Sequence, residues 1–192
     1  YVADPEQWYF ALRIPDLWRM MFPVAPEMSD AAALDAAYGQ SRLDRVVSAA
    51  GPFEIVHQTL YRVHQRVAKT FRLGRVFLVG DAAHINNPLG GMGMNGGIHD
   101  AINLTDVLGE VWHGRAEAVA LDRYDRQRRG VTLEAVQVQT VQNKRDLEAA
   151  DAADQAAFRE RLRRISGDEA ETRAFLKRLS MLASLERAAE LG

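Results

Sequence analysis

The chain has 192 residues, of which 47% are hydrophobic and 26% charged, and its formal net charge is -2. This composition is ordinary for a globular protein and provides no basic surface of the kind that binds nucleic acid. No apolar run approaches the roughly 18 residues that a membrane-spanning helix needs, and the absence of cysteine excludes disulfides and thiolate metal sites. We therefore expect a cytoplasmic protein that binds neither nucleic acid nor a membrane.

The N-terminal residues predict an antiparallel hairpin. Residues 7–14 alternate large apolar side chains with polar or smaller ones, and a second alternating run covers residues 18–24. Pro15 and Asp16 lie between the two runs, and both residue types favour turns. Two alternating strands joined by so short a turn pair with each other.

A helix and two more strands are expected after the hairpin. Ser29 is a good N-terminal cap for a helix that we expect to continue to Val47. Residues 53–58 and 61–68 are rich in aromatic and branched side chains, which predicts two further strands. This region therefore predicts a sheet accompanied by one helix.

The stretch that follows has the order of a strand-loop-helix ligand site. Residues 76–79 are all apolar and are closed by Gly80, which predicts a strand buried on both faces of a parallel sheet. Asp81 would stand at its carboxyl end, where ligands bind in such sheets, and its carboxylate could accept hydrogen bonds from sugar hydroxyls. The alternative is that Asp81 only caps a helix.

A glycine-rich loop leads from Asp81 into a predicted helix. Five of the eight residues 90–97 are glycine, which is tolerated where a chain turns tightly or passes close to a ligand. From about Met94 the apolar residues recur at helical spacing, so we expect a packed face on Ile98, Ala101, Ile102, Thr105, Leu108, Gly109 and Trp112. The start of this helix would offer free N–H groups to an electron-rich ligand.

Three blocks in this stretch carry a family resemblance. They are GRVFLVGDAAH at residues 74–84, P-x-G-G-x-G-x-N at 88–95 and D-A-x-N-L at 100–104. Together they resemble the second flavin-binding motif of the FAD-dependent aromatic hydroxylases, single-component flavoprotein monooxygenases similar to p-hydroxybenzoate hydroxylase. Three blocks in order are far more specific than a lone glycine motif.

The resemblance implies a mixed α/β fold in three parts. They are part of a mixed-sheet substrate domain in residues 1–73, the C-terminal strand-loop-helix of a three-layer FAD-binding fold in 74–130, and a C-terminal helical segment in 131–192. The N-terminal dinucleotide-binding half of that fold is absent from this chain. 

The resemblance also implies a cofactor and a reaction. Asp81 would bind the ribityl or ribose hydroxyls of FAD, and Pro88 would lie beside the isoalloxazine ring. The pyrimidine edge of the ring would be contacted by Gly91, Gly93, Met94 and Asn95. NADH or NADPH would reduce FAD, and molecular oxygen would then form a flavin hydroperoxide that hydroxylates a small phenolic substrate. No side chain of this chain is assigned as catalytic.

Substrate contacts are expected from the sheet region, because the family uses that sheet to cover the flavin. Residues with suitable chemistry are Arg13, Met21, His57 and Tyr61, with Arg19 and His64 as further candidates. The alternative for each is an ordinary surface or core position. His57 and His64 would face opposite sides of a strand, and no histidine pair has helical metal-ligand spacing, so we expect no metal site.

The C-terminal third predicts helices. Residues 121–129 resemble the family's L-x-x-Y-x-x-x-R-R segment, which is structural there. Amphipathic patterns then predict helices over residues 131–147, 151–165 and 169–191. These helices can pack against the flavin domain or against a second subunit, which would make a homodimer.

Two observations suggest that the chain is the C-terminal half of a longer enzyme. It begins with Tyr1, and it contains neither the G-x-G-x-x-G nor the D-G cofactor motif of the family. One alternative is a fragment with no activity of its own and weak or no FAD binding. Another is a related FAD oxidoreductase, such as a halogenase, a reductase or a quinone-pathway hydroxylase.

Overall fold

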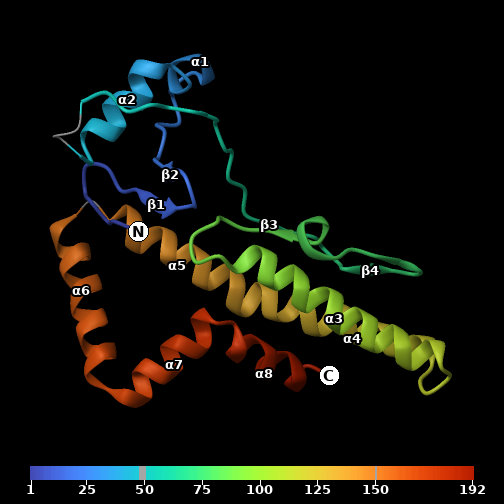
Figure 1. Cartoon of the computed structure of the whole chain (residues 1–192). Coiled ribbons are helices and arrows are strands. Elements are labelled where there is room, and N and C mark those ends of the chain that lie inside the picture. Colours follow the sequence, from blue (N-terminus) through green and yellow to red (C-terminus); the bar gives the residue numbers. More distant parts are fainter. Residues whose placement is uncertain (48–50, 150) are drawn as a thin grey trace. The chain divides into compact units, whose positions relative to one another are not determined.

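The computed structural model describes residues 1–47, 51–149 and 151–192, and it divides into two compact units (Figure 1). The first comprises Tyr1–Arg62 with Leu147–Ala150, and the second comprises Val63–Asp146 with Asp151–Gly192. The mixed α/β class is confirmed, with short strands and a majority of helix. The division into parts at residues 1–73, 74–130 and 131–192 stays a prediction.

The predicted hairpin is present in the first unit. Strand β1 (Phe10–Arg13) pairs antiparallel with β2 (Trp18–Met21), and the Ile14 N–H donates to the Leu17 carbonyl at 2.9 Å across the turn. The turn residues therefore set the register, as their chemistry predicted.

The single helix expected from Ser29 to Val47 is wrong, because the chain forms two helices. Ser29 does cap α1 (Asp30–Ala33), since its hydroxyl accepts a backbone N–H at 3.2 Å. Asp35 then caps α2 (Ala36–Asp44) by accepting two backbone N–H groups at 2.9 and 3.1 Å. A second cap so soon after the first ends α1 after one turn.

The strands expected over residues 53–58 and 61–68 are also largely wrong. The backbone from Gly51 to Gln65 is irregular, and only β3 (Arg66–Val67) is a strand. Apolar residues in this segment, such as Val56, are exposed. A strand needs a neighbour to pair its N–H and C=O groups, and within the described residues only the last two positions find one.

The central strand differs from its prediction in the second unit. Strand β5 (Val76–Phe77) pairs antiparallel with β4 (Arg72–Leu73), while β3 pairs antiparallel with β6 (His84–Ile85). The side chain of Val76 is exposed rather than buried. The apolar run finds no parallel neighbour among the described residues, so the expectation of a strand buried on both faces is not met.

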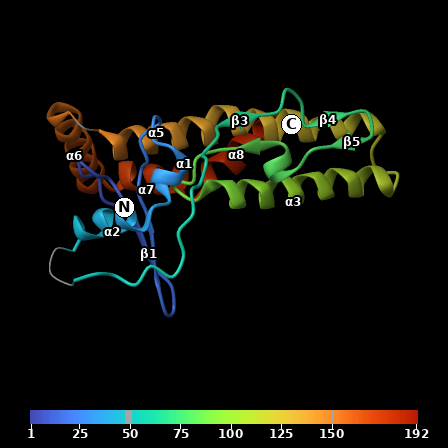
Figure 2. The same cartoon turned by 90° about the horizontal axis from the view of Figure 1, so that it is seen from above.

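Long helices make up most of the second unit. Helix α3 (Met92–Trp112) lies along a continuous helical stretch formed by α4 and α5, as both views show (Figures 1 and 2). That stretch consists of a 3-10 turn at Ala118–Leu121, α4 at Asp122–Tyr124, π-helical turns at Asp125–Arg129 and Thr132–Val136, and α5 at Gln137–Glu148. None of the helices in the described part of the chain has the length and apolar character to cross a membrane.

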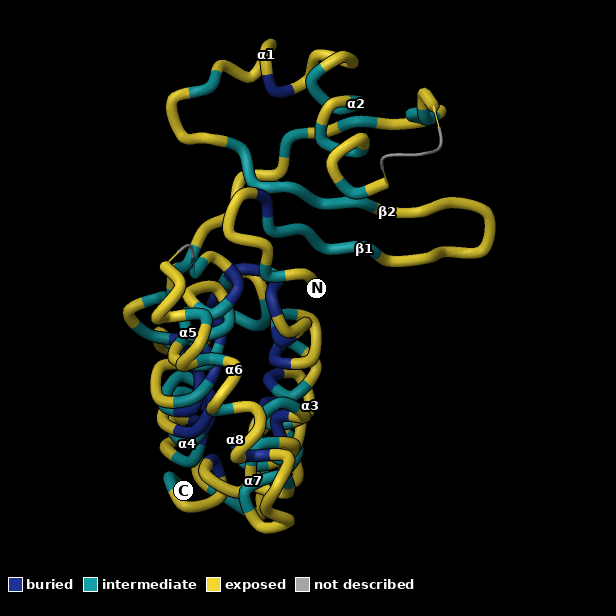
Figure 3. Tube along the Cα trace, turned by 90° about the vertical axis from the view of Figure 1, so that its left-hand side faces the viewer, coloured by how far each residue is buried: buried dark blue, intermediate teal, exposed yellow. Residues whose placement is uncertain are grey.

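The packed face predicted for α3 is wrong. Ile98, Ile102 and Trp112 are 49%, 55% and 86% exposed. The buried residues of α3 are instead Met92, Gly96, Asp100, Leu104 and Val107 (Figure 3). The apolar stripe predicted the helix correctly but not the face that the second unit covers, because a buried aspartate lies at the centre of that face.

The C-terminal residues form α6 (Ala152–Gly167), α7 (Glu169–Leu179) and α8 (Leu182–Glu190). The continuous helix expected over residues 169–191 is broken at Met181, whose φ of 62° is left-handed. Met181 is buried and packs with Met92 of α3 and with Val136. Burial of this side chain offsets a conformation that L-residues rarely adopt.

A second cluster of buried residues joins the strands to the helices. Phe71, Ala83, Leu104 and Tyr124 pack together, and the Tyr124 hydroxyl donates to the Leu78 carbonyl at 2.6 Å. Burial, with a further contribution from the charge of Asp100, raises the pKa of Tyr124 well above its usual value. The phenol therefore stays protonated and serves as a hydrogen-bond donor.

We expect the substitution Tyr124→Phe to destabilise the second unit by about 1–3 kcal/mol, because it leaves the Leu78 carbonyl without its donor. Urea unfolding followed by circular dichroism measures the change. Tyr61→Phe is the matched control, since the side chain of Tyr61 is 66% exposed and should tolerate the loss. Equal stability of the two variants would contradict the assignment.

Candidate functional site

Asp81 is available to a ligand. It belongs to the 3-10 turn Gly80–Ala82, which follows β5, and it is exposed. Its carboxylate makes no hydrogen bond with the residues that the structure describes, so the alternative role as a helix cap is not observed. An exposed carboxylate without a protein partner suits hydroxyl groups of a ligand.

The first turn of α3 is open to solvent. Its N-terminal residue Gly91 has a left-handed φ of 66°, and no side chain caps the helix. Met94 and Asn95 are exposed, and the Asn95 amide donates back to the Gly91 carbonyl at 3.1 Å. No acidic residue lies in this turn. Free N–H groups and the positive end of the helix dipole therefore face outward, which suits an electron-rich group.

Two glycines of the loop differ in what surrounds them. A β-carbon on Gly90 would lie 2.5 Å from Nδ2 of Asn143, so packing excludes a side chain there. A β-carbon on Gly93 would meet only Oδ1 of Asn86, at an ordinary 3.6 Å. The protein itself thus leaves room at Gly93, and the missing side chain keeps the surface of the loop open.

Pro88 is half-buried and is held through its neighbour Asn87. The Asn87 amide donates to Oε1 of Gln65 at 2.9 Å and to the Thr140 carbonyl at 3.0 Å, while its oxygen accepts the Leu89 N–H at 3.1 Å. These bonds fix the loop to the segment before β3 and to α5. The sequence analysis did not identify Asn87, Gln65 or Thr140, because partners 22 and 53 positions apart leave no local pattern.

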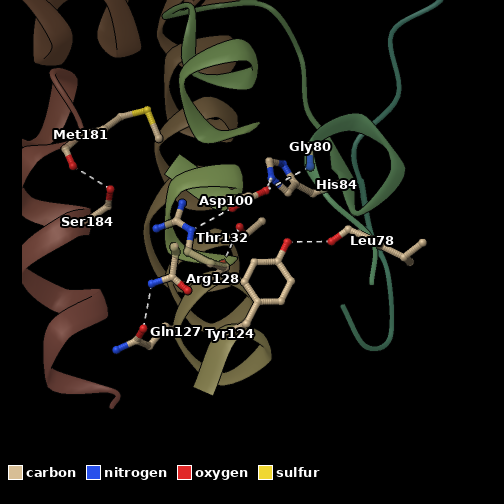
Figure 4. A network of polar contacts seen from close by, with 11 residues as sticks. Leu78, Gly80, His84, Asp100, Tyr124, Gln127, Arg128, Thr132, Met181 and Ser184 are labelled. Atoms are coloured by element: carbon tan, nitrogen blue, oxygen red, sulfur yellow. Dashed lines mark hydrogen bonds and ion pairs between the residues drawn. The ribbon is translucent and has the colours of Figure 1, made fainter. Parts of the chain in front are cut away.

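A buried carboxylate connects the turn, the strand and the two helices (Figure 4). Oδ2 of Asp100 lies 2.8 Å from Nε2 of His84 and accepts the N–H of Gly80 at 3.2 Å. Its Oδ1 accepts Nε–H of Arg128 at 2.8 Å. All three side chains are almost completely buried. His84, for which both structural and catalytic roles were open, makes a structural contact here.

The electrostatics favour an ionised Asp100. Burial by itself raises the pKa of this carboxyl, but the hydrogen bonds with His84 and Arg128 and the charge of Arg128 outweigh it, so the pKa lies below its usual value. Burial and the same guanidinium also lower the pKa of the neighbouring His99. The site therefore contains one buried ion pair, Asp100 with Arg128.

Two glycines of α3 allow the turn to approach the helix. A β-carbon on Gly97 would come within 3.2 Å of the Cα of Gly80, and one on Gly96 would lie 3.2 Å from Cε1 of His84. Both approaches are closer than side chains normally make. The turn that carries Asp81 is therefore seated directly on α3, and part of the glycine pattern serves packing rather than a ligand.

The residues predicted to contact substrate all lie in the first unit. Arg13 and Met21 are at opposite ends of the β1–β2 hairpin, since Arg13 pairs with Trp18 and Met21 with Phe10. His57 and Tyr61 lie in the irregular segment before β3 and are exposed, as are the further candidates Arg19 and His64. Contact of these residues with a substrate stays a prediction. No group of three or more potential metal ligands occurs in the described part of the chain.

Comparison with known proteins identifies a family. Residues 17–139 match the family described as FAD binding domain. The chain is 40% identical over 136 residues to 6-hydroxy-3-succinoylpyridine 3-monooxygenase of Pseudomonas putida (strain DSM 28022 / S16), covering 68% of this chain and 33% of that protein. It is 35% identical over 191 residues to para-nitrophenol 4-monooxygenase of Pseudomonas sp. (strain WBC-3), covering 95% of this chain and 46% of that protein.

A solved structure supports the same relationship. The crystal structure of p-nitrophenol 4-monooxygenase from Pseudomonas putida DLL-E4 matches with a TM-score of 0.76 and 31% identity, over 94% of this chain and 45% of that one. The chain thus spans between one third and about half of the length of these relatives.

The Asp100 ion pair predicts a pH-dependent stability. Because the folded pKa lies below the ordinary 3.8, the stabilisation is complete above that pH and is lost as the pH falls through the folded value. We expect Asp100→Asn to be about 3 kcal/mol less stable than the wild type near neutral pH, since Arg128 loses its counter-charge. This difference should shrink below about pH 4. Urea unfolding over a pH series measures it, and a constant difference would contradict the assignment.

Proposed function

The chain belongs to the FAD binding domain family, and from this premise we propose that its loop from Asp81 to Asn95 forms the riboflavin end of an FAD site in an aromatic monooxygenase. The observation that carries the proposal is the open N-terminus of α3, which has no capping side chain and stands beside an exposed carboxylate without a protein partner. Such a site fits both the hydroxyl groups and the electron-rich ring edge of FAD.

Each residue of the loop has a proposed role. Asp81 accepts hydrogen bonds from the ribityl or ribose hydroxyls. Pro88, fixed by Asn87, lies beside the isoalloxazine ring. The pyrimidine edge is contacted by backbone and side-chain groups of the first turn of α3, namely Gly91, Gly93, Met94 and Asn95. The helix N-terminus would stabilise negative charge on that edge by about 0.3–2 kcal/mol.

The proposed reaction is the hydroxylation of a small phenolic substrate. When bound, the flavin would activate molecular oxygen with electrons from NADH or NADPH. Residues of this chain would hold and orient the cofactor and exclude water from it. The two curated relatives described above are named for a hydroxypyridine and a nitrophenol, which supports an aromatic ring carrying a hydroxyl group. Arg13, Met21, His57 and Tyr61 are the proposed substrate contacts.

The site as proposed is completed by residues outside this chain. No G-x-G-x-x-G motif is present to bind the pyrophosphate, and the chain covers less than half of its relatives. The exposed apolar residues of α3, Met94, Ile98, Ile102 and Trp112, form a surface of the kind that another part of a fold covers. The same observations favour one alternative, in which the isolated chain binds FAD weakly or not at all and is inactive.

The substitution Asp81→Ala tests the cofactor site. In the complete protein we expect FAD affinity to fall about tenfold to a hundredfold, since hydrogen bonds to a charged group contribute about 1.5–3 kcal/mol. Quenching of flavin fluorescence on titration measures the affinity. Asp106→Ala is the control, because Asp106 is an exposed aspartate on α3. Equal affinity of the two variants would refute the role of Asp81.

A panel of phenols tests the reaction. We expect phenols to stimulate the oxidation of NADH or NADPH by the complete protein loaded with FAD, and mass spectrometry should find one added oxygen atom in the product. A product that instead requires halide would identify a halogenase. Reduction of the flavin with no substrate hydroxylation in any case would support a reductase.

A further inference from the structure

We propose that Asp100 is a positioning residue for the flavin site, because its carboxylate holds the peptide N–H of Gly80 and thereby sets the position of Asp81. This inference rests on the proposed function, in which Asp81 contacts FAD. Asp100 itself is completely buried on α3 and is not exposed to any ligand.

The contact reaches Asp81 through one peptide. Oδ2 of Asp100 accepts the Gly80 N–H at 3.2 Å, and Asp81 is the next residue (Figure 4). Gly80 has a left-handed φ of 60°, so the chain changes direction at this point. A change in the hold on Gly80 therefore alters the direction in which the Asp81 side chain leaves the turn.

The same backbone is held two residues earlier by a second bond. The Tyr124 hydroxyl donates to the Leu78 carbonyl at 2.6 Å, while Asp100 takes the Gly80 N–H. Tyr124 is on the stretch containing α4, whereas Asp100 is on α3, so the short segment from Leu78 to Gly80 is fixed to both helices. Two holds on three residues leave little freedom to the turn that follows.

The other side of Asp100 is fixed by Arg128. Its Nε–H donates to Oδ1 at 2.8 Å, and Arg128 belongs to the π-helical turn Asp125–Arg129. Short π-helical turns inside helices are often found at functional sites. Here the turn brings the buried guanidinium to the one carboxylate oxygen that Gly80 and His84 do not use.

Packing alone does not require this arrangement. A buried ion pair can often be replaced by apolar residues of similar volume without loss of stability. What an apolar pair cannot supply is a directed acceptor for the Gly80 N–H. This difference separates positioning from simple stabilisation and provides the design of the test.

The informative variant is Asp100→Leu/Arg128→Met in the complete protein. It removes both charges, so no unpaired buried charge remains, and it removes the acceptor of the Gly80 N–H. We expect a melting temperature near that of the wild type, but FAD affinity at least about tenfold lower by fluorescence titration. Without FAD, hydrogen exchange should become faster at the Gly80 amide.

A second variant provides the rescue. Asp100→Asn/Arg128→Met is also free of charge, but its amide oxygen can accept the Gly80 N–H, so most of the FAD affinity should return. Asp106→Asn is the matched control for an aspartate on the exposed side of α3, and its affinity should equal that of the wild type. If the Leu/Met variant does not fold, Arg128→Lys keeps the charge while losing Nε, and should show a smaller loss of affinity.

The outcomes separate the two levels of the proposal. A wild-type protein that does not bind FAD overturns the proposed function, and the exchange rate at Gly80 then decides whether Asp100 positions the turn. A wild type that binds FAD, together with a folded Leu/Met variant of unchanged affinity, overturns the positioning role alone. Unchanged affinity in a folded Arg128→Lys variant has the same meaning if the Leu/Met variant is lost.

Discussion

The buried carboxylate of Asp100 is the interaction on which the second unit depends. A charge that is removed from water must be paired and hydrogen-bonded, so the fold has to bring Arg128, His84 and the Gly80 N–H to the same point. Those three partners come from a helix, a strand and a turn. Pairing one carboxylate thus determines which face of α3 is buried and where the turn after β5 crosses it.

The glycine-rich stretch divides into positions with separate functions, and the division follows from this crossing. Gly96 and Gly97 lie under His84 and Gly80, where side chains would collide. Gly91 begins α3 in a conformation that favours glycine. Gly93 meets no such obstacle, so in the proposed site its lack of a side chain serves the ligand rather than the fold.

Local features were predicted well and distant pairings were not. The hairpin and the caps of the helices depend on neighbouring residues, so Pro15, Asp16 and Ser29 indicated them correctly. The buried face of α3 could not be predicted, because Asp100 is buried only through Arg128, 28 positions away. The loop motif located the candidate site by resemblance, whereas its supports at Asn87 and Arg128 depend on contacts that form only after folding.

The π-helical turns have a consequence for how this chain can vary in length. Each π-helical turn accommodates more residues than an α-helical one, so Arg128 and the α5 residues that hold the loop depend on the residue count of the stretch 125–136. Deletion of a single residue there would rotate everything that follows by about 100°. Thr140 and Asn143 would then turn away from the loop, so homologous sequences that keep this site should show no gap in the stretch.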